Sequence, residues 1–323
     1  MQLDTVAYAE RKSILPKNIF LASIYIIILI FIITGVISFI SAYKITHPSK
    51  LETPQITSNI APNYKNISFY TGETEEKING WFFPSGTSKT SVLLVHGYGK
   101  NRLQFDEETF KLISRLTNES LNVLTFDLRG SGNSSGSITT FGKNETADVL
   151  SAIKYLKQQG TDRIILMGFS TGASSCLSAV VESPYKESII GVIGDSPYST
   201  VDNYIDHAIN SNSFLSETPF RQAVEFFVRK LTKVSSNMDI IPKISSLIQT
   251  PLLLIDGVQQ DIPASDNTRL LYEMCYRKKP ANANYWNSES QEYCQSFSHN
   301  PENYMDKVVE FINGCIGEAN REQ

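Results

Sequence analysis

The chain has 323 residues, of which 41% are hydrophobic and 19% charged, and its formal net charge is -4 at pH 7. This apolar content supplies a sizeable core and excludes a mainly disordered chain, and the slightly acidic balance argues against a general nucleic-acid binder. The four cysteines form no C-x-x-C pair and the four histidines form no H-E-x-x-H motif, so neither a zinc finger nor a metallohydrolase is indicated. We expect no metal and no cofactor.

The first predicted element follows an N-terminal tail, residues 1–18, and is strongly apolar. No charged residue occurs from Asn18 to Tyr43. Residues 19–40 would rise about 33 Å as a helix, enough to cross a hydrocarbon core of about 30 Å. A buried core helix is rarely this apolar on every face, and the apolar region of a signal peptide is shorter. The sequence therefore predicts a retained, single-pass transmembrane helix over residues 19–43.

Basic residues flank this helix on both sides, three before it and two after it. They are Arg11, Lys12 and Lys17 before the helix, and Lys44 and Lys50 after it. The excess favours a cytoplasmic N-terminus and a body on the far side of the membrane, but by one charge only, so the orientation stays open. A body on that side would allow a disulfide between Cys275 and Cys294.

Residues 44–62 contain three prolines and no periodic pattern, which predicts a linker, and the body follows over residues 63–323. Short apolar segments typical of buried strands alternate there with helical patterns. The predicted strands are 67–70, 78–83, 91–95, 121–126, 164–167, 189–193 and 252–255, and the helices include 107–116, 145–157 and the residues after Ser170. This alternation predicts an α/β fold with a doubly wound, mostly parallel sheet. A helical segment at about 199–247 interrupts it and predicts a small cap over one end of the sheet.

The most informative motif is the G-x-S-x-G sequence from Gly168 to Gly172, which has Ser170 at its centre. It follows a predicted strand and precedes a helix rich in small residues, so it forms a strand–turn–helix that raises the serine above the sheet. Glycines are needed on both sides because a Cβ atom would collide with the neighbouring strand and helix. The helix N-terminus also brings backbone N–H groups close to the serine oxygen.

Three further segments accompany this motif: VLLVHGYG at 92–99, DLRGSGNS at 127–134 and GDSPY at 194–198. Together the four segments resemble the α/β-hydrolase superfamily, and specifically its smaller, membrane-anchored, esterase-like branch of serine hydrolases. The resemblance covers about residues 64–314. It implies an α/β-hydrolase fold, an acyl-enzyme formed on Ser170, and a Ser-Asp-His order of catalytic residues along the chain.

A serine hydroxyl needs a base to take its proton, and histidine is the expected residue. Of the four histidines, His47 lies beside the membrane helix, His96 belongs to the segment that resembles the oxyanion loop, and His207 lies in the cap. His299 precedes a predicted C-terminal helix at 304–312, as the catalytic histidine does in the family. We therefore expect His299 to be the base.

The family places its acid shortly after the strand that is predicted at 252–255. Here Asp261 falls one position later than in the usual turn, but Pro263 supports the same turn, and we expect Asp261 to be the acid. Asp195, after the preceding strand, is the alternative, because some relatives take their acid from there. The backbone N–H of Thr171 is one expected oxyanion donor by geometry, and the resemblance implies that of Tyr98 as the second.

The predicted function is a membrane-anchored serine hydrolase that cleaves ester, thioester or amide bonds through an acyl-enzyme on Ser170. A small or lipid-like acyl substrate is expected, because the anchor would hold the site near acyl lipids. Two alternatives stay open. One is a serine peptidase for short peptides, and the other is a non-catalytic binding module, suggested by the irregular turn at Asp261. Asp127 and Arg129 are expected to close a structural turn, and no oligomeric state is indicated.

Overall fold

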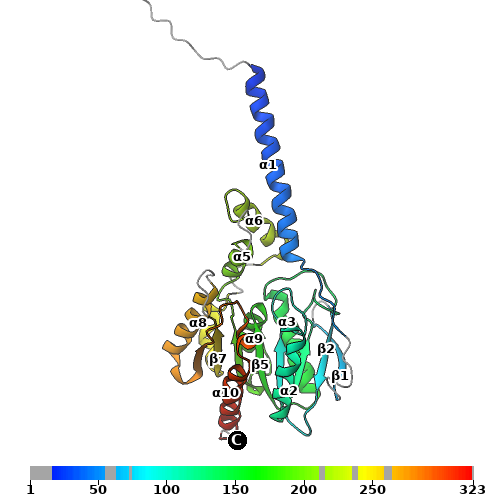
Figure 1. The fold of residues 1–323 in the computed structure, drawn as a ribbon, viewed down its shortest axis with the longest axis vertical. Coiled ribbons are helices and arrows are strands. Elements are labelled where there is room, and N and C mark those ends of the chain that lie inside the picture. The colour runs from blue at the N-terminus through cyan, green and yellow to red at the C-terminus, as the bar shows by residue number, and fades with distance from the viewer. Residues whose placement is uncertain are drawn as a thin grey trace, which may run out of the picture.

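A computed structural model describes residues 17–54, 63–72, 75–210, 215–234, 239–257 and 264–321 of the chain. Figure 1 shows a body built around a sheet, from which one long helix, α1 (Lys17–Thr46), projects. Two shorter helices, α5 (Val201–Asn210) and α6 (Phe220–Thr232), form a cap beside the lower part of α1.

The sheet has eight strands in the order β1-β2-β4-β3-β5-β6-β7-β8. Strand β2 is antiparallel to both of its neighbours, and the other pairs are parallel, so the predicted mostly parallel, doubly wound sheet is confirmed. The strands are β1 (Lys65–Tyr70), β2 (Lys77–Phe83), β3 (Thr90–Val95), β4 (Asn122–Phe126), β5 (Arg163–Phe169), β6 (Ile189–Asp195), β7 (Leu252–Asp256) and β8 (Ala283–Asn287). The sequence analysis missed β8, a short edge strand that carries two asparagines and is only partly buried.

Alternate side chains of the central strands enter two different cores, as the pleat requires. In β3, Leu93 and Val95 pack on one face of the sheet, and Val92 and Leu94 pack on the other. The first face is covered by α3 (Lys143–Gln158), α4 (Thr171–Glu182), α7 (Ile244–Leu247) and α8 (Ala264–Lys278). The second is covered by α2 (Thr109–Asn118), α9 (Ser296–His299) and α10 (Pro301–Arg321). Because the strands from β4 to β8 in the sheet order are parallel, their carboxyl ends meet at one edge of the sheet, where polar residues can gather.

The cap is shorter than the predicted segment at about 199–247. Its helices α5 and α6 share a separate apolar cluster with the end of α1. Ile240, Ile244 and Leu247, which the prediction assigned to the cap, pack instead in the core beneath α4 and α8. The segment after residue 239 thus belongs to the body.

The last turns of α1 are built into this cap cluster. Ser38, Ala42 and Thr46 lie one turn apart on one face of the helix, and all three are fully buried. Beyond them, Tyr98 Oη donates a hydrogen bond to Ile45 O at 2.9 Å, and the N–H of Thr139 donates to Thr46 O at 2.8 Å. Helix α1 therefore continues past residue 43, where the membrane helix was predicted to end.

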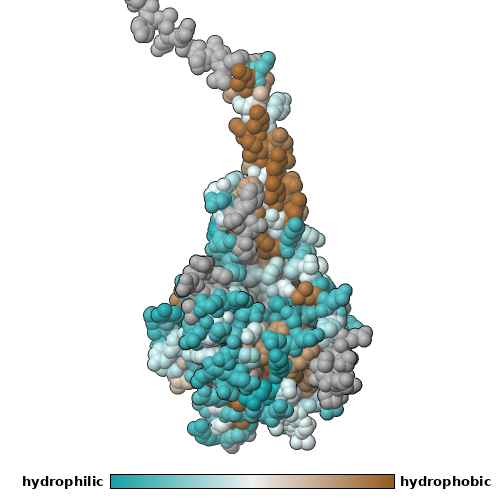
Figure 2. Space-filling model, in the orientation of Figure 1, coloured by the Kyte–Doolittle hydropathy of each residue, from teal (hydrophilic) through white to brown (hydrophobic). Residues whose placement is uncertain are grey.

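The rest of α1 has a different environment. Residues Asn18–Thr46 are long and apolar enough to cross a membrane, and their most apolar 18-residue stretch has a mean hydropathy of 2.9 and no buried residue. Figure 2 shows this part of α1 as a continuous hydrophobic surface above a largely hydrophilic body. The exposure excludes the interpretation of α1 as a buried core helix.

The four cysteines are free and buried. Cys275 packs on the α8 side of the sheet, whereas Cys294 packs on the α10 side. The sheet separates the two thiols, so the disulfide that the sequence allowed is not formed.

Candidate active site

Ser170 occupies the sharp turn between β5 and α4. Its backbone has φ 52° and ψ -121°, a left-handed conformation that is unusual for a residue other than glycine. The N–H of Ser170 donates to Asp195 O at 2.8 Å, which ties the turn to the end of β6. This strained strand–turn–helix is the geometry of a nucleophile elbow.

The two glycines of the motif are required by close approach. A Cβ atom on Gly168 would lie 2.5 Å from Ala173 Cα, and one on Gly172 would overlap the carbonyl oxygens of His96 and Val95. The elbow can therefore sit tightly between β3 and α4 only if both positions lack a side chain.

Two backbone donors are available beside the elbow. The N–H of Thr171 is at the first position of α4, where the helix offers no acceptor. The N–H of Tyr98 lies in the loop after β3, whose start is held by a bond from Gly97 N–H to Gln104 Oε1 at 2.7 Å. Neither N–H is bonded to another residue in the described parts of the chain. Both expected donors are thus free to donate a hydrogen bond to a ligand oxygen.

The hydroxyl of Ser170 faces a tyrosine. Tyr293 Oη lies 3.0 Å from Ser170 Oγ and 2.9 Å from Ser196 O. Burial raises the pKa of Tyr293 well above its ordinary value, so the phenol stays protonated. A protonated phenol cannot take a proton from serine, and Tyr293 therefore holds Ser170 without activating it.

No histidine is hydrogen-bonded to Ser170 in the described structure. His96 is buried, with Nδ1 2.8 Å from Gly97 O and Nε2 accepting from Leu128 N–H at 3.0 Å, so both of its nitrogens are used. His207 of α5 packs its ring 5.3 Å from the Tyr293 ring, and burial lowers its pKa. The imidazole that packs on the Tyr293 ring therefore belongs to the cap, and its lowered pKa favours the neutral form.

His299, the expected base, is exposed at the last position of α9. Phe297 turns inward in the same helix and packs 5.0 Å from Phe105 and 5.6 Å from Tyr304, between ring centroids. Residues two positions apart in a helix differ by about 200° in direction. Because Phe297 points into the core, His299 points away from it and forms no pair with Ser170 in this structure.

The expected acid, Asp261, lies outside the described residues. The alternative, Asp195, is fully buried, and it accepts hydrogen bonds from Ser196 Oγ at 2.8 Å and from Tyr304 Oη at 3.1 Å. Asp256, at the end of the neighbouring strand, is also buried and accepts from Gly257 N–H at 2.9 Å. Burial raises the pKa of Asp195 to about 6 and that of Asp256 to about 7. No described histidine links either carboxyl group to Ser170.

The turn after β4 has the structural role that was expected of it. Asp127 is fully buried and accepts three hydrogen bonds, from Arg102 N–H at 2.8 Å, Arg102 Nη2 at 2.6 Å and Asn133 N–H at 2.8 Å. Arg129 pairs with buried Asp148 through Nη2 at 2.6 Å and Nε at 3.0 Å. Both side chains thus brace loops beside the elbow.

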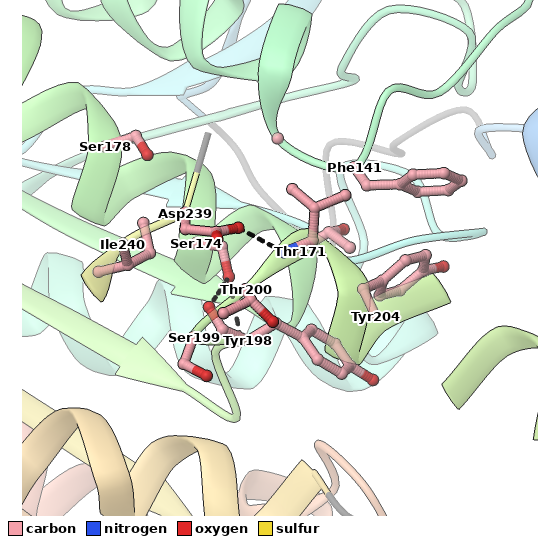
Figure 3. Close-up of a pocket in the computed structure, with 12 residues that line it drawn as sticks. Phe141, Thr171, Ser174, Ser178, Tyr198, Ser199, Thr200, Tyr204, Asp239 and Ile240 are labelled. Atoms are coloured by element: carbon pink, nitrogen blue, oxygen red, sulfur yellow. Dashed lines mark hydrogen bonds between the residues drawn. The ribbon is translucent and has the colours of Figure 1, made fainter. Parts of the chain in front are cut away.

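The space next to the elbow is small. A cavity of about 20 Å³ lies between α4 and the cap (Figure 3), lined by Thr171, Ser174, Tyr198, Tyr204 and other residues. A second, of about 10 Å³, lies against Tyr98 and Thr171. Each is close to the volume of a single water molecule, so a substrate can reach these places only after the cap or its loops move. No cluster of three His, Cys, Asp or Glu side chains within the described ranges offers a metal site.

Tyr293 is the site residue that the sequence analysis missed. It follows β8, and a residue after a parallel strand would have been a candidate for this edge of the sheet. Because β8 itself was not predicted, no signal pointed to Tyr293.

Comparison with known proteins agrees with this geometry. The family model of the alpha/beta hydrolase fold matches residues 90–305, more than half of the chain. Among curated proteins, YqkD of Bacillus subtilis is 25% identical over 239 residues, which cover 73% of this chain and 75% of YqkD. YfhR of Escherichia coli K12 is 23% identical over 258 residues, 78% of this chain and 81% of YfhR.

Solved structures give the same result. The esterase Pf2001 of Pyrococcus furiosus superposes with a TM-score of 0.68 at 25% identity, covering 84% of this chain and 98% of the esterase. A carboxyl esterase of Bacillus coagulans has a TM-score of 0.60 at 13% identity, over 79% of this chain and 99% of that protein, a likeness of fold. From the elbow, the sheet order and the family match together, the chain belongs to the α/β-hydrolase family.

Proposed function

We propose that this protein is a membrane-anchored serine hydrolase of the esterase type, with Ser170 as its nucleophile. The observation that carries the proposal is the elbow itself. Ser170 is held in a strained turn, and the unbonded N–H groups of Thr171 and Tyr98 lie beside it. A serine is seldom held in such strain unless its oxygen has to be presented to a reacting group.

The reaction that this arrangement supports is acyl transfer. Ser170 Oγ attacks the carbonyl carbon of an ester, and the carbonyl oxygen becomes an oxyanion that accepts hydrogen bonds from Thr171 N–H and Tyr98 N–H. The ester C–O bond breaks, the alcohol leaves with a proton, and water then hydrolyses the acyl-enzyme. A base must take the Ser170 proton and return it to the leaving group.

His299, with Asp261, remains the proposed base and acid. For His299 to act, Tyr293 has to leave Ser170 and α9 has to turn the imidazole inward. The small cavities beside the elbow independently require a movement of the cap before a substrate can bind. Both requirements describe an enzyme whose resting state is closed.

The membrane anchor is the second part of the proposal. The exposed apolar length of α1 supports a span, because this surface would otherwise face water. The buried face at Ser38, Ala42 and Thr46 supports retention of the helix, because cleavage as a signal peptide would remove part of the cap cluster. An amphiphilic ester is the substrate class that such an anchored site would meet.

One observation favours a second candidate, a non-catalytic binding module with the hydrolase fold. Tyr293 stands at the serine oxygen, where a hydrolase needs its base, and it cannot accept the serine proton. In such a module the oxyanion donors would bind a carbonyl or carboxylate oxygen without turnover.

Labelling of the full-length protein in detergent with a fluorophosphonate, together with hydrolysis of p-nitrophenyl esters, separates the two candidates. A hydrolase reacts with the probe, loses the reaction in Ser170→Ala, and loses at least about 10²-fold in turnover in His299→Ala. The matched control is His47→Ala, whose ring stacks on Tyr43 of α1, and it should retain activity.

A binding module gives a different pattern. The wild type is not labelled and does not hydrolyse esters, whereas Tyr293→His, which places an imidazole at Ser170, gains labelling. Wild-type activity that survives in His299→Ala would instead remove His299 from the mechanism and leave the hydrolase proposal standing.

A further inference from the structure

We infer that helix α6 of the cap lies in the headgroup layer of the bilayer that holds α1, with its exposed face against anionic lipid. This inference rests on the proposed membrane anchor. It adds a second contact with the membrane and puts the roof of the Ser170 site at the lipid surface.

The contacts of α6 with α1 determine how deep α6 lies in the bilayer. The Phe227 ring packs edge-on against Phe39 of α1 with 5.4 Å between ring centroids, and Ala42 is buried in the same cluster as Val224 and Val228. Figure 1 shows α6 beside the lower part of α1, with α5 between α6 and the body. The uncharged run of α1 ends at Tyr43, so α6 lies level with the end of the apolar segment. That end is where a spanning helix meets the lipid headgroups.

The side of α6 that faces away from the cap cluster has the composition of an interfacial helix. Its exposed residues Gln222, Phe226 and Lys230 are spaced one turn apart and form one stripe. Phe226 is 55% exposed, and Lys230 Nζ lies 5.7 Å from the centre of its ring. An exposed aromatic ring under a long basic side chain suits a layer in which apolar groups point inward and charges reach the phosphates.

The charges around α6 favour an anionic surface. The acidic groups of α5 and α6 all pair with arginines, since Arg221 pairs with Asp206 at 2.6 Å and Arg229 pairs with both Asp202 and Glu225. Near α6, the exposed Lys44, Lys230 and Lys233 form no ion pair with any described residue. With the exposed Glu217 before α6 included, five basic side chains stand against four acidic ones. The lysine charges that are not paired within the cap complement phosphate headgroups.

The cap connects this surface to the site. Tyr204 of α5 packs 5.6 Å from the Tyr98 ring and 4.9 Å from the Tyr198 ring, and Tyr198 packs 5.8 Å from the Tyr293 ring. Tyr204 of the cap thus belongs to the same group of packed rings as Tyr293, whose hydroxyl contacts Ser170. A ligand that leaves the bilayer beside α1 would reach the cap first.

Single-cysteine labelling of the full-length protein tests the inference. The four native cysteines are buried and free, so an introduced, exposed thiol is the one that reacts. A bimane fluorophore is attached at Phe226→Cys, at Ile28→Cys in the middle of the exposed part of α1, and at Leu270→Cys on α8, where the native side chain is 42% exposed. The three proteins are reconstituted in vesicles of phosphatidylcholine and phosphatidylglycerol that contain lipids brominated near the headgroup or deep in the acyl chain.

We expect headgroup-brominated lipid to quench position 226 several-fold more than position 270, and deep-brominated lipid to quench position 28 most. If position 28 is quenched but position 226 is quenched no more than position 270, the inference about α6 is overturned and the proposed anchor stands. Absence of quenching at 28 would overturn the anchor and the inference together.

Charge-reversal variants and a change of vesicle composition test the preference for anionic lipid. Lys230→Glu combined with Phe226→Cys should lose most of the quenching at 226, whereas Lys186→Glu, an exposed lysine of the body outside the cap, should not change it. Equal quenching at 226 in vesicles of phosphatidylcholine alone would overturn the assignment of anionic headgroups as the partner.

Discussion

Replacement of the buried Asp127 carboxylate is expected to be severely destabilising. In Asp127→Ala the guanidinium of Arg102 stays buried without its partner, and the N–H groups of Arg102 and Asn133 lose their acceptor. Removal of one member of a buried ion pair costs about 3–5 kcal/mol, and the buried N–H of Arg102 left without an acceptor costs about 1–3 kcal/mol, whereas the N–H of the exposed Asn133 can turn to water. We expect a loss of about 5 kcal/mol or more, comparable with the whole stability of many domains.

The surface pair Lys100–Asp106 supplies the control. Its charged atoms are 3.8 Å apart, and the Asp106 side chain is 80% exposed, so loss of the charge in Asp106→Asn should cost about 1 kcal/mol or less. Asparagine is chosen because residue 106 has a φ of 49°, which Asn tolerates better than Ala. Both variants are unfolded by urea in detergent and followed by tryptophan fluorescence, since Arg102 Cζ lies 4.6 Å from the Trp81 ring and the change is local to it. The milder Asp127→Asn keeps the shape and should fall between the two. Asp127→Ala within about 1 kcal/mol of Asp106→Asn would refute the structural role of the turn.

Three further predictions follow from single contacts. Gly172→Ala places a Cβ atom against the carbonyl oxygens of His96 and Val95, so it should abolish the fluorophosphonate labelling expected of the wild type. The control is Gly314→Ala, which has open space around it and should be labelled like the wild type. Equal labelling of the two variants would contradict the elbow geometry. Burial raises the pKa of Asp256 to about 7 from 3.8, so the native state binds this proton more tightly than the unfolded state and stability should fall as pH rises from about 4 to 7. Melting temperatures between pH 5 and 8 should fall less steeply in Asp256→Asn, and an unchanged slope would count against this assignment. Tyr98→Phe removes the hydrogen bond to Ile45 O and should cost about 1 kcal/mol by urea unfolding, and a stability equal to wild type would mean that the bond contributes nothing.

The buried end of α1 also affects how the protein should be truncated. A body that begins at residue 44 lacks Ser38 and Ala42, which fill part of the cap cluster. Truncation before Ser38 keeps that cluster. An activity assay on a body that begins at residue 44 would instead measure the loss of cap packing together with the loss of the apolar helix.

Patterns among neighbouring residues determined the apolar helix, the fold class and the turn that holds Ser170. The apolar run of α1, the alternation of strands and helices, and the elbow at Ser170 are each set by neighbouring residues, so each was predicted from the sequence. The same local logic assigned Asp127 and Arg129 to a structural turn. It failed at β8, where asparagines and partial exposure give a weak strand pattern.

Tertiary structure alone decided which side chain meets Ser170. Tyr293 reaches its oxygen from 123 residues away, and Phe297 fills the core in a way that turns His299 outward. Tyr304 and Ser196 occupy the oxygens of Asp195, which a triad would have left to a histidine. These outcomes depend on loop paths and on competition for buried space between distant segments, and no pattern of neighbouring residues encodes either of them.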